Sequence, residues 1–306
     1  MKKNYILVCL LFILMLIFIF SKYISLNNGD NIESLLPKIE NKNEIILFNR
    51  YNQNIVTYDT NKKSITQWND NSNLFQYEFN TSSDLYTSGH SIDNEFKILK
   101  FENGSYKIIY NLNKNEAFFP LASDGDTHLF VHSFYNKDGS EILSKRTISL
   151  FDEKEKKLHD YKNTRGLILY GAFYDNKLFY TTYQQSSDTF DLYSLDFSNF
   201  DSDPTLLEKG LEDGKVFVSI DGLWKSNNNY IYNEDKKFSI AKLNYIDKDS
   251  NNLIQIDIDN GQIYLKVTDI QTKKEYLYFK NVIDFKIDND TITIYGDKYI
   301  DTKKLL

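Results

Sequence analysis

The chain has very little cysteine, proline and methionine. Its 306 residues include one cysteine, Cys9, with three prolines and two methionines. A single cysteine cannot form a disulfide within the chain, so packing and backbone hydrogen bonds must hold the fold together. The formal net charge of −7 comes from 43 acidic and 36 basic residues. Because no basic stripe is present to neutralise a phosphate backbone, the sequence argues against nucleic acid as a partner.

Aromatic residues are abundant instead. The chain contains 23 tyrosines and 22 phenylalanines, and 41% of its residues are hydrophobic, which is enough to bury a large core. Aromatic and β-branched side chains fit the half-buried surface of a sheet better than a helix. The many asparagines and lysines are typical of a bacterial genome with low GC content and carry no information about function.

The N-terminus contains the one long apolar run. Lys2 and Lys3 precede sixteen apolar residues, 5–20. A helix over residues 1–24 is long enough to span a hydrocarbon core of about 30 Å, with residues 5–21 in contact with lipid. No small-x-small cleavage site follows, which favours an uncleaved anchor over a signal peptide. The lysine pair predicts a cytoplasmic N-terminus, with the rest of the chain outside the cell membrane.

Lipidation of Cys9 is not expected, because the apolar run lies mainly after this residue and Val8 is not the small residue that such a site needs. Residues 25–43 are polar and predict a stalk. The folded domain is expected over residues 44–306. The predicted organisation is therefore an anchor, a stalk and one domain.

A pattern of strand, turn and strand recurs along this domain. In residues 55–68, alternating apolar residues run into an acidic residue, a polar turn follows, and the alternation resumes. The corresponding polar residues along the chain are Asp59, Glu102, Asp152, Asp196, Asn244 and Asp288. They are 43, 50, 44, 48 and 44 residues apart, which is the period of a four-stranded propeller blade. The sequence therefore predicts an all-β protein folded as a β-propeller.

Assigning strands to these units gives six blades. The first unit shows three strands, 44–49, 54–59 and 64–68, and each later unit shows four. The later strands are expected at 74–79, 84–88, 95–101 and 105–110; 117–121, 128–134, 146–151 and 157–161; 167–174, 177–183, 191–197 and 205–208; 216–220, 230–232, 238–243 and 253–258; and 262–267, 275–279, 283–287 and 291–295. The remaining strand, 298–302, is expected to complete the first blade and close the ring. A seven-bladed or incomplete ring is the alternative.

With its anchor and its six short-stranded units, the chain resembles the superfamily of bacterial extracytoplasmic six-bladed propellers similar to TolB. The resemblance covers residues 44–302 and concerns architecture. No regular Trp-Asp or Gly-His repeat is present, and Trp68 and Trp224 do not occupy equivalent places. No functional residue is carried over from the superfamily, because a fold alone does not specify a function.

The histidines do not predict a metal site. The chain has four, His90, His128, His132 and His159. His128 and His132 would face the same way on a strand, but four residues at about 3.3 Å each place them about 13 Å apart, too far for one ion. A zinc site is therefore not expected.

Two segments imitate calcium loops. Residues 247–251 have spaced oxygen ligands, but Asn252 stands where the sharp turn needs glycine and Ile258 stands where a bidentate glutamate would close the loop. Residues 257–261 predict a hairpin turn instead, since Asn-Gly readily adopts positive φ. The sequence thus predicts no metal and no cofactor.

Catalytic patterns are sparse. Glycoside hydrolysis needs two carboxylates that project into the central funnel, and Glu78 and Glu116 are candidates, although each could simply face solvent at the end of a strand. No Gly-x-Ser-x-Gly elbow, glycine-rich phosphate loop or local Ser/His/Asp set is present, so no catalytic residue is assigned.

Tyrosines are concentrated in residues 170–183, where they could form an aromatic surface for sugar or peptide. The simpler interpretation is that Tyr170, Tyr174, Tyr180 and Tyr183 pack between blades. The candidate ligand-binding residues are Glu78, Glu116, Tyr170 and Tyr174.

These observations favour a single-pass, membrane-anchored propeller that binds a protein or a cell-wall glycan outside the cytoplasmic membrane, without catalysis. The alternative is an enzyme, a glycosidase or lyase acting on polysaccharide through carboxylates in the funnel. A sensory or immunity protein paired with the product of a neighbouring gene is a third possibility.

Overall fold

The computed structural model describes residues 39–49, 54–69, 75–77, 85–90, 96–102, 105–113, 115–124, 126–161, 166–198, 202–247 and 250–306. The predicted anchor and most of the predicted stalk lie outside these residues. Within them, no helix is long and apolar enough to cross a membrane. The ordered elements are strands β1 to β26 and one short 3-10 turn, η2 (Leu143–Lys145).

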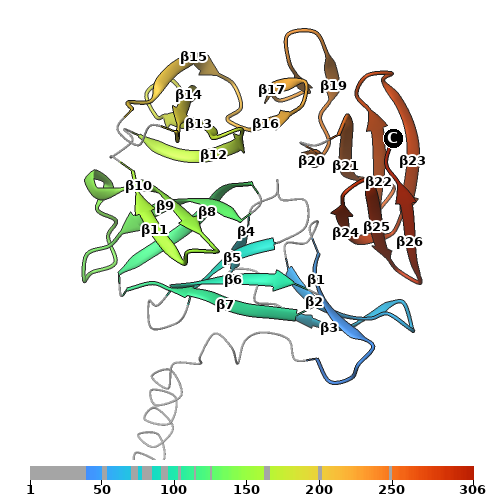
Figure 1. The fold of residues 1–306 in the computed structure, drawn as a ribbon. Coiled ribbons are helices and arrows are strands. Elements are labelled where there is room, and N and C mark those ends of the chain that lie inside the picture. The colour runs from blue at the N-terminus through green and yellow to red at the C-terminus, as the bar shows by residue number, and fades with distance from the viewer. Residues whose placement is uncertain are drawn as a thin grey trace, which may run out of the picture.

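The strands form seven antiparallel sheets (Figure 1). Within each sheet, neighbouring strands are consecutive in the sequence. The sheets are β1 (Glu44–Asn49), β2 (Asn54–Asp59) and β3 (Ser64–Asn69); β4 (Phe75–Tyr77), β5 (Leu85–His90), β6 (Phe96–Glu102) and β7 (Ser105–Asn111); β8 (Glu116–Asp124), β9 (Thr127–Phe134), β10 (Thr147–Asp152) and β11 (Lys157–Asp160); β12 (Leu167–Tyr174), β13 (Lys177–Gln184), β14 (Thr189–Asp196) and β15 (Thr205–Leu211); β16 (Val216–Ser219), β17 (Gly222–Ser226), β18 (Tyr230–Tyr232) and β19 (Lys237–Ser239); β20 (Leu243–Ile246), β21 (Asn252–Asp259), β22 (Gln262–Asp269) and β23 (Lys274–Lys280); and β24 (Val282–Asp288), β25 (Thr291–Gly296) and β26 (Tyr299–Lys304).

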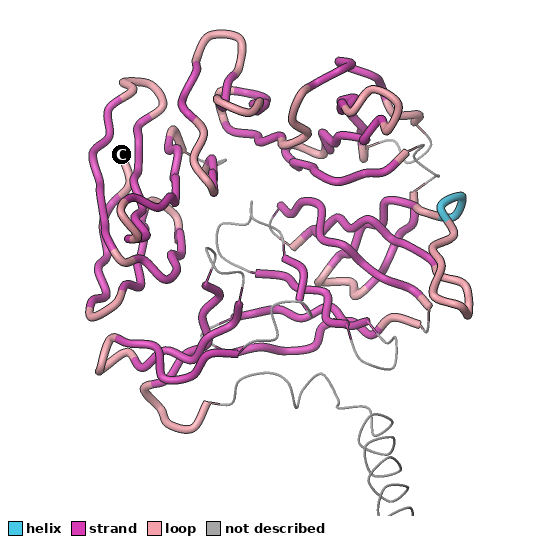
Figure 2. The backbone as a smooth tube through the Cα atoms, turned by 180° about the vertical axis from the view of Figure 1, so that it is seen from behind, coloured by secondary structure: helices cyan, strands magenta, loops and turns pink. Residues whose placement is uncertain are grey.

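The sheets follow one another around a ring, which the view from behind also shows (Figure 2). The first strands contact each other from sheet to sheet: β4 contacts β8, β8 contacts β12, β12 contacts β16, and β16 contacts β20. The last sheet returns to the first through a contact between β24 and β1. Radially arranged antiparallel meanders of this kind are a β-propeller. The predicted all-β propeller is therefore confirmed.

The expected strands match the observed ones up to β16, and the division into units differs after that. Sequence analysis missed β17, which follows β16 through a two-residue hairpin, with Ser219 opposite Gly222. Gly222 has φ of +101°, a conformation that residues with a side chain rarely adopt. Because β17 was missed, β18 and β19 were assigned one place too early. The expected strand 238–243 also joined β19 to β20, so β21 and all later strands were assigned two places too early. The described strands after residue 240 then form two sheets, β20–β23 and β24–β26.

Three of the recurring polar residues, Asp59, Asp152 and Asp196, cap a turn, whereas Asn244 and Asp288 lie in the first strands β20 and β24. In β10–β11, Asp152 Oδ1 accepts hydrogen bonds from the backbone amides of Lys154 and Glu155, and Lys156 has positive φ. This arrangement is an Asx turn, which fixes a tight hairpin. The β22–β23 hairpin repeats it with Asp269 and with Lys273 at positive φ. The acidic residue at the end of the third strand is therefore a folding signal.

The same turn joins β2 to β3, where Asp59 Oδ1 accepts from the amides of Asn61 and Lys62, and Lys63 has positive φ. The register of β3 on β2 also shifts, as it does between the third and fourth strands at β6–β7, β14–β15 and β22–β23. The strand β3 is thus equivalent to an outermost, fourth strand. The first sheet consists of second, third and fourth strands, and the position of its innermost strand is not filled by a described strand.

The C-terminal strand does not fill that position. Residues 298–302 were expected to complete the first sheet, but β26 pairs with β25 along its whole length. Asp297 and Lys298 make the tight turn between them, with Lys298 at φ of 72°. A local hairpin closes a much shorter loop than a return to the first sheet, so its entropic cost is lower.

Side-chain packing closes the ring instead. Leu47, Val56 and Tyr58 of the first sheet form one buried cluster with Ile283 of the last sheet. The Tyr58 hydroxyl donates to the carbonyl oxygens of Gly296, at 2.8 Å, and Tyr299, at 3.1 Å. We call this contact the closure interface.

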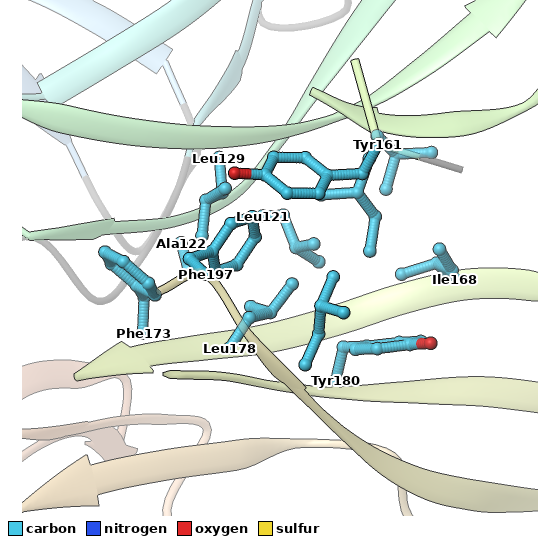
Figure 3. Close-up of a cluster of buried hydrophobic side chains, with 12 residues drawn as sticks. Leu121, Ala122, Leu129, Tyr161, Ile168, Phe173, Leu178, Tyr180 and Phe197 are labelled. Atoms are coloured by element: carbon cyan, nitrogen blue, oxygen red, sulfur yellow. The ribbon is translucent and has the colours of Figure 1, made fainter. Parts of the chain in front are cut away.

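Large apolar side chains also fill the space between consecutive sheets. Figure 3 shows the cluster between β8–β11 and β12–β15. Gly171 of β12 allows the closest approach there, because a Cβ at this position would lie 2.7 Å from Leu121 Cγ. This interface holds β12 firmly in place beside β8.

Candidate ligand-binding face

The beginnings of β8, β12 and β16 mark one face of the ring, which we call the start face. These first strands lie side by side. Because second strands are antiparallel to first strands, β9 and β13 end on this face, with Glu116 opposite Phe134 and Leu167 opposite Tyr183. The start face therefore gathers residues that are far apart in the sequence.

A bulge in β12 exposes apolar side chains on the start face. The register of β12 on β13 shifts between Ile168 and Tyr170. As a result two consecutive residues, Leu169 and Tyr170, are both exposed, at 44% and 36%, while Ile168 is buried. Leu167 is exposed as well. Bulges re-aim side chains in this way next to functional sites.

Tyr170 stands at the edge of an aromatic group. Its ring centroid lies 6.2 Å from that of Phe190, which in turn lies 5.3 Å from that of Tyr183. Partial burial, with a further contribution from the charge of Asp213, raises the pKa of Tyr170. Its hydroxyl is therefore neutral at physiological pH and can act as donor or acceptor. Tyr170 thus combines an accessible ring with a polar tip, which suits ligand recognition.

A polar row crosses the neighbouring β8–β11 sheet from Glu116 to Asp160. His132 lies between the two carboxylates: its Nε2 is 3.5 Å from Glu116 Oε2, and its Nδ1 is 3.2 Å from Asp160 Oδ1. The hydrogen bond with His132, followed by the one with Ser149, lowers the pKa of Asp160. The Glu116 side chain is 21% exposed and that of His132 only 4%. Glu116 and Asp160, whose side chain is 48% exposed, are therefore the members of this row that a ligand on the start face can reach.

The row contains serine, histidine and aspartate, but it is not arranged as a nucleophilic triad. In such a triad the serine hydroxyl hydrogen-bonds to one imidazole nitrogen and the aspartate holds the other. Here the Ser149 hydroxyl donates to Asp160, and Ser149 Oγ and Asp160 both lie beside Nδ1 of His132. Ser149 is also fully buried. The geometry thus stabilises the Asp160 carboxylate and does not activate the hydroxyl.

The other end of this sheet carries a second polar cluster. His128 Nδ1 lies 2.9 Å from Ser123 Oγ, and its Nε2 lies 4.0 Å from Glu153 Oε2. Lys100, on the preceding sheet, donates to the same Glu153 oxygen at 2.8 Å. Burial lowers the pKa of His128 to about 4. This cluster joins two sheets away from the start face, and its role is structural.

The structure places two of the four predicted ligand-binding residues on the first strands of neighbouring sheets. Glu116 and Tyr170 lie on the start face, on neighbouring sheets. Tyr174 lies at the other end of β12, opposite Lys177 and partly buried against a core cluster, about 13 Å along the strand from Tyr170. Glu78 lies outside the described residues. Whether any of the four binds a ligand stays a prediction.

The other sequence-based interpretations can also be located. Tyr180 is buried in the cluster of Figure 3, as the packing interpretation expects. The 257–261 hairpin is confirmed, with Asn260 and Gly261 both at positive φ. His128 and His132 have separate sets of partners. Among the described residues, no three histidine, cysteine, aspartate or glutamate side chains gather so that they could hold a metal ion.

Sequence reasoning missed Leu169 and the row from His132 to Asp160. The bulge that exposes Leu169 leaves no mark in the apolar alternation of β12. His132 and Asp160 are 28 residues apart, and only the registers of β9, β10 and β11 align them.

Comparisons with known proteins give distant structural likenesses. No family model matches the chain, and no curated protein matches it. Among solved structures it is similar to TolB from Acinetobacter baumannii, with a TM-score of 0.49 and 13% identity over 76% of this chain. The match spans 62% of that TolB chain.

Two further solved structures show the same level of likeness. A chain of the nidogen/laminin complex has a TM-score of 0.47 and 11% identity, covering 77% of this chain and 92% of that one. The β-propeller domain of the Trilobed protease from Pyrococcus furiosus has a TM-score of 0.44 and 13% identity, covering 86% and 91%. The class of the protein is that of the β-propellers, and the functional conclusions below rest on its own residues.

Proposed function

We propose that this protein is a binding propeller held at the outer side of the cytoplasmic membrane, which presents its start face to a protein or a cell-wall glycan without catalysing a reaction. The observation that carries the proposal is the β12 bulge, which exposes Leu169 and Tyr170, with the partly exposed carboxylate of Glu116 at the start of the neighbouring first strand β8. Exposed apolar and aromatic side chains next to a few polar groups are typical of recognition sites.

The placement in the cell rests on the N-terminal sequence. Lys2 and Lys3, followed by the apolar residues 5–20, support a single-pass anchor with a cytoplasmic N-terminus. We further propose that the seven sheets are seven blades of one ring, with the first blade lacking its innermost strand and the last lacking its outermost.

Binding without catalysis is supported by the arrangement of the polar row. The Ser149 hydroxyl serves Asp160, and His132 is buried between two carboxylates, so neither is presented to a substrate. Glu116 and Asp160 are both accessible, but the buried ring of His132 contacts both of them and fills the space between them, where glycoside hydrolysis needs the sugar.

The test is binding by the full-length protein in detergent micelles. Purified cell-wall glycan and solubilised membrane protein serve as two separate probes. Tyr170→Ala should weaken binding of one probe, because it removes the exposed ring from the start face. Leu206→Ala, an exposed residue of the outer strand β15, is the matched control and should bind normally. Equal binding by both variants and the unaltered protein would contradict the proposal.

Cellular placement needs a second measurement. Protease added to intact cells should digest the domain and spare a tag placed before Lys2. Protection of the domain in intact cells would place it on the cytoplasmic side and would overturn this part of the proposal.

A further inference from the structure

The outer strands of the sheets differ in charge. An outer strand has an open edge that other strands can join, and proteins commonly protect such edges with lysine. Six of the seven outer strands carry at least one lysine. These lysines are Lys107 in β7, Lys157 in β11, Lys209 in β15, Lys237 in β19, Lys274 and Lys280 in β23, and Lys303 and Lys304 in β26.

The strand β3 has none. Its sequence, Ser-Ile-Thr-Gln-Trp-Asn, contains no charged residue and no proline. Lys62 and Lys63 precede it in the turn, where Lys62 pairs with Asp59. Five of these strands are fourth strands, as β3 is by its Asx turn and register shift, and β26 is the third and last strand of its sheet. Its edge therefore lacks the protection that the other six share.

An apolar row also ends at this edge. Leu47 of β1 lies opposite Val56 of β2, and Val56 lies opposite Trp68 of β3. Leu47 and Val56 are buried, whereas Trp68 is 52% exposed. The neighbouring Thr66 and Gln67 are exposed as well. A further strand beside β3 would continue the row with its own residue next to Trp68 and would cover the exposed part of the ring.

We propose that β3 is a docking edge for an extended, uncharged segment of a partner protein, which adds to the first sheet as an outer strand. Backbone hydrogen bonds along β3 supply the affinity, and an aromatic or β-branched side chain beside Trp68 supplies the selectivity. The partner strand is uncharged because β3 offers no ion-pair partner of its own. This site lies at the outer edge of the ring and is separate from the start face.

The register shift at Thr66 limits the usable edge. Gln67 and Trp68 pair regularly with Thr57 and Val56, on one side of the shift. The docked segment should therefore pair chiefly with the half of β3 that contains Trp68. This predicts that changes at Gln67 and Trp68 affect binding more than changes at Ser64.

The experiment uses full-length protein and a short blocked peptide of alternating valine and threonine with a central phenylalanine. Trp68 reports binding through its fluorescence, since the other tryptophan, Trp224, is fully buried. The expected result is a blue shift of Trp68 emission, with slower hydrogen exchange of the β3 amides. A peptide with lysine in place of threonine should bind weakly.

Gln67→Lys adds a protecting lysine and keeps the reporter, and it should weaken binding of the uncharged peptide by about tenfold or more. Thr302→Lys, on the outer strand β26, is the matched control and should bind like the unaltered protein. Both changes are at exposed positions, so the free energy of unfolding should stay within about 0.5 kcal/mol. Unchanged binding by Gln67→Lys, or equal binding of both peptides, would overturn the proposal.

Two further outcomes would also overturn it. Protection of the β3 amides that increases with protein concentration, without peptide, would mean that the edge pairs with a second copy of the chain. Protection that is already complete in dilute protein would mean that the chain covers its own edge. The two sites are separate, so Tyr170→Ala should lose binding at the start face and still bind the peptide at β3. The two proposals can therefore fail separately.

Discussion

The closure interface and the interface between β8–β11 and β12–β15 both pack one sheet against the next, but they join sheets that are differently separated in the sequence. The second joins sheets that are adjacent in the sequence and fills the space with twelve buried residues (Figure 3). The first joins the two ends of the domain, and its buried cluster has four members. It adds hydrogen bonds from Tyr58 and a backbone bond from Lys298 N to Lys63 O at 2.7 Å. The smaller apolar interface thus relies more on specific hydrogen bonds.

The largest expected effect is at the closure interface. Tyr58 is fully buried, and burial raises the pKa of its hydroxyl to about 12, so it remains a neutral donor. Tyr58→Ala removes the ring and the donor and should lower the free energy of unfolding by about 3–5 kcal/mol. Urea denaturation followed by circular dichroism measures the change. Tyr58→Phe separates the two contributions and should cost about 1–2 kcal/mol. If Tyr58→Ala lowered the free energy of unfolding by less than Tyr58→Phe does, this account would be contradicted.

The next effect is in the sequential interface. Leu178 is fully buried in the cluster of Figure 3, and Leu178→Ala should cost about 2–5 kcal/mol through lost contacts and a cavity. Exposed Leu207 of β15, in the same sheet, is the control, and Leu207→Ala should stay within about 0.5 kcal/mol. Hydrogen exchange would sharpen the comparison: Leu178→Ala should loosen β8–β15 first, and Tyr58→Ala should loosen β1–β3 and β24–β26 first.

Acid should affect the interface that contains His128. The folded-state pKa, about 4, lies below the ordinary value of 6.5, because burial disfavours the charged form. The unfolded chain therefore binds a proton at a pH where the folded chain does not, and stability falls as the pH drops from about 6.5 to about 4. The loss is on the order of 3 kcal/mol at most. Denaturation of His128→Gln at several pH values should show a flatter profile. An identical slope in both proteins would exclude His128 as the cause.

A smaller effect is expected where Gly171 meets Leu121. Adding a methyl group there forces Leu121 or β12 to move, so Gly171→Ala should cost about 1–3 kcal/mol. Thermal unfolding measures it. In a chain that already carries Leu121→Ala, the cost of Gly171→Ala should be smaller, because the alanine side chain leaves room for the added methyl group. Strictly additive costs would show that the two residues do not contact each other.

Much of the fold could be predicted from local patterns. Alternating apolar residues located the strands as far as β16. Each sheet is a meander, so every strand appears in the sequence as its own run of alternating apolar residues, followed by a polar turn. The division into sheets failed where Ile220 and Asp221 make a turn too short to interrupt the alternation visibly, and again where the expected strand 238–243 joined β19 to β20. The better marker was the Asx turn, with aspartate four residues before a lysine at positive φ, as at Asp59 and Asp152.

Only part of the candidate site could be predicted from the sequence, for a physical reason. Glu116 and Tyr170 were singled out by chemistry, and their placement on neighbouring sheets depends on two first strands lying side by side. Tyr174 was grouped with Tyr170 by sequence distance, yet four residues of extended chain carry it to the other face. The bulge at Leu169 and the alignment of His132 with Asp160 arise from register, which the apolar pattern does not encode.

The central claim is that the ring closes by packing the first sheet against the last. The most direct measurement is a cross-link between the two turns that meet there, using Lys63→Cys and Lys298→Cys in a chain with Cys9→Ser. Oxidation should form a disulfide within one chain and raise the Tm, because the bond closes a very long loop in the unfolded state. Failure to form the bond, or cross-links only between chains, would show that the two ends of the domain do not meet and would contradict the closed ring.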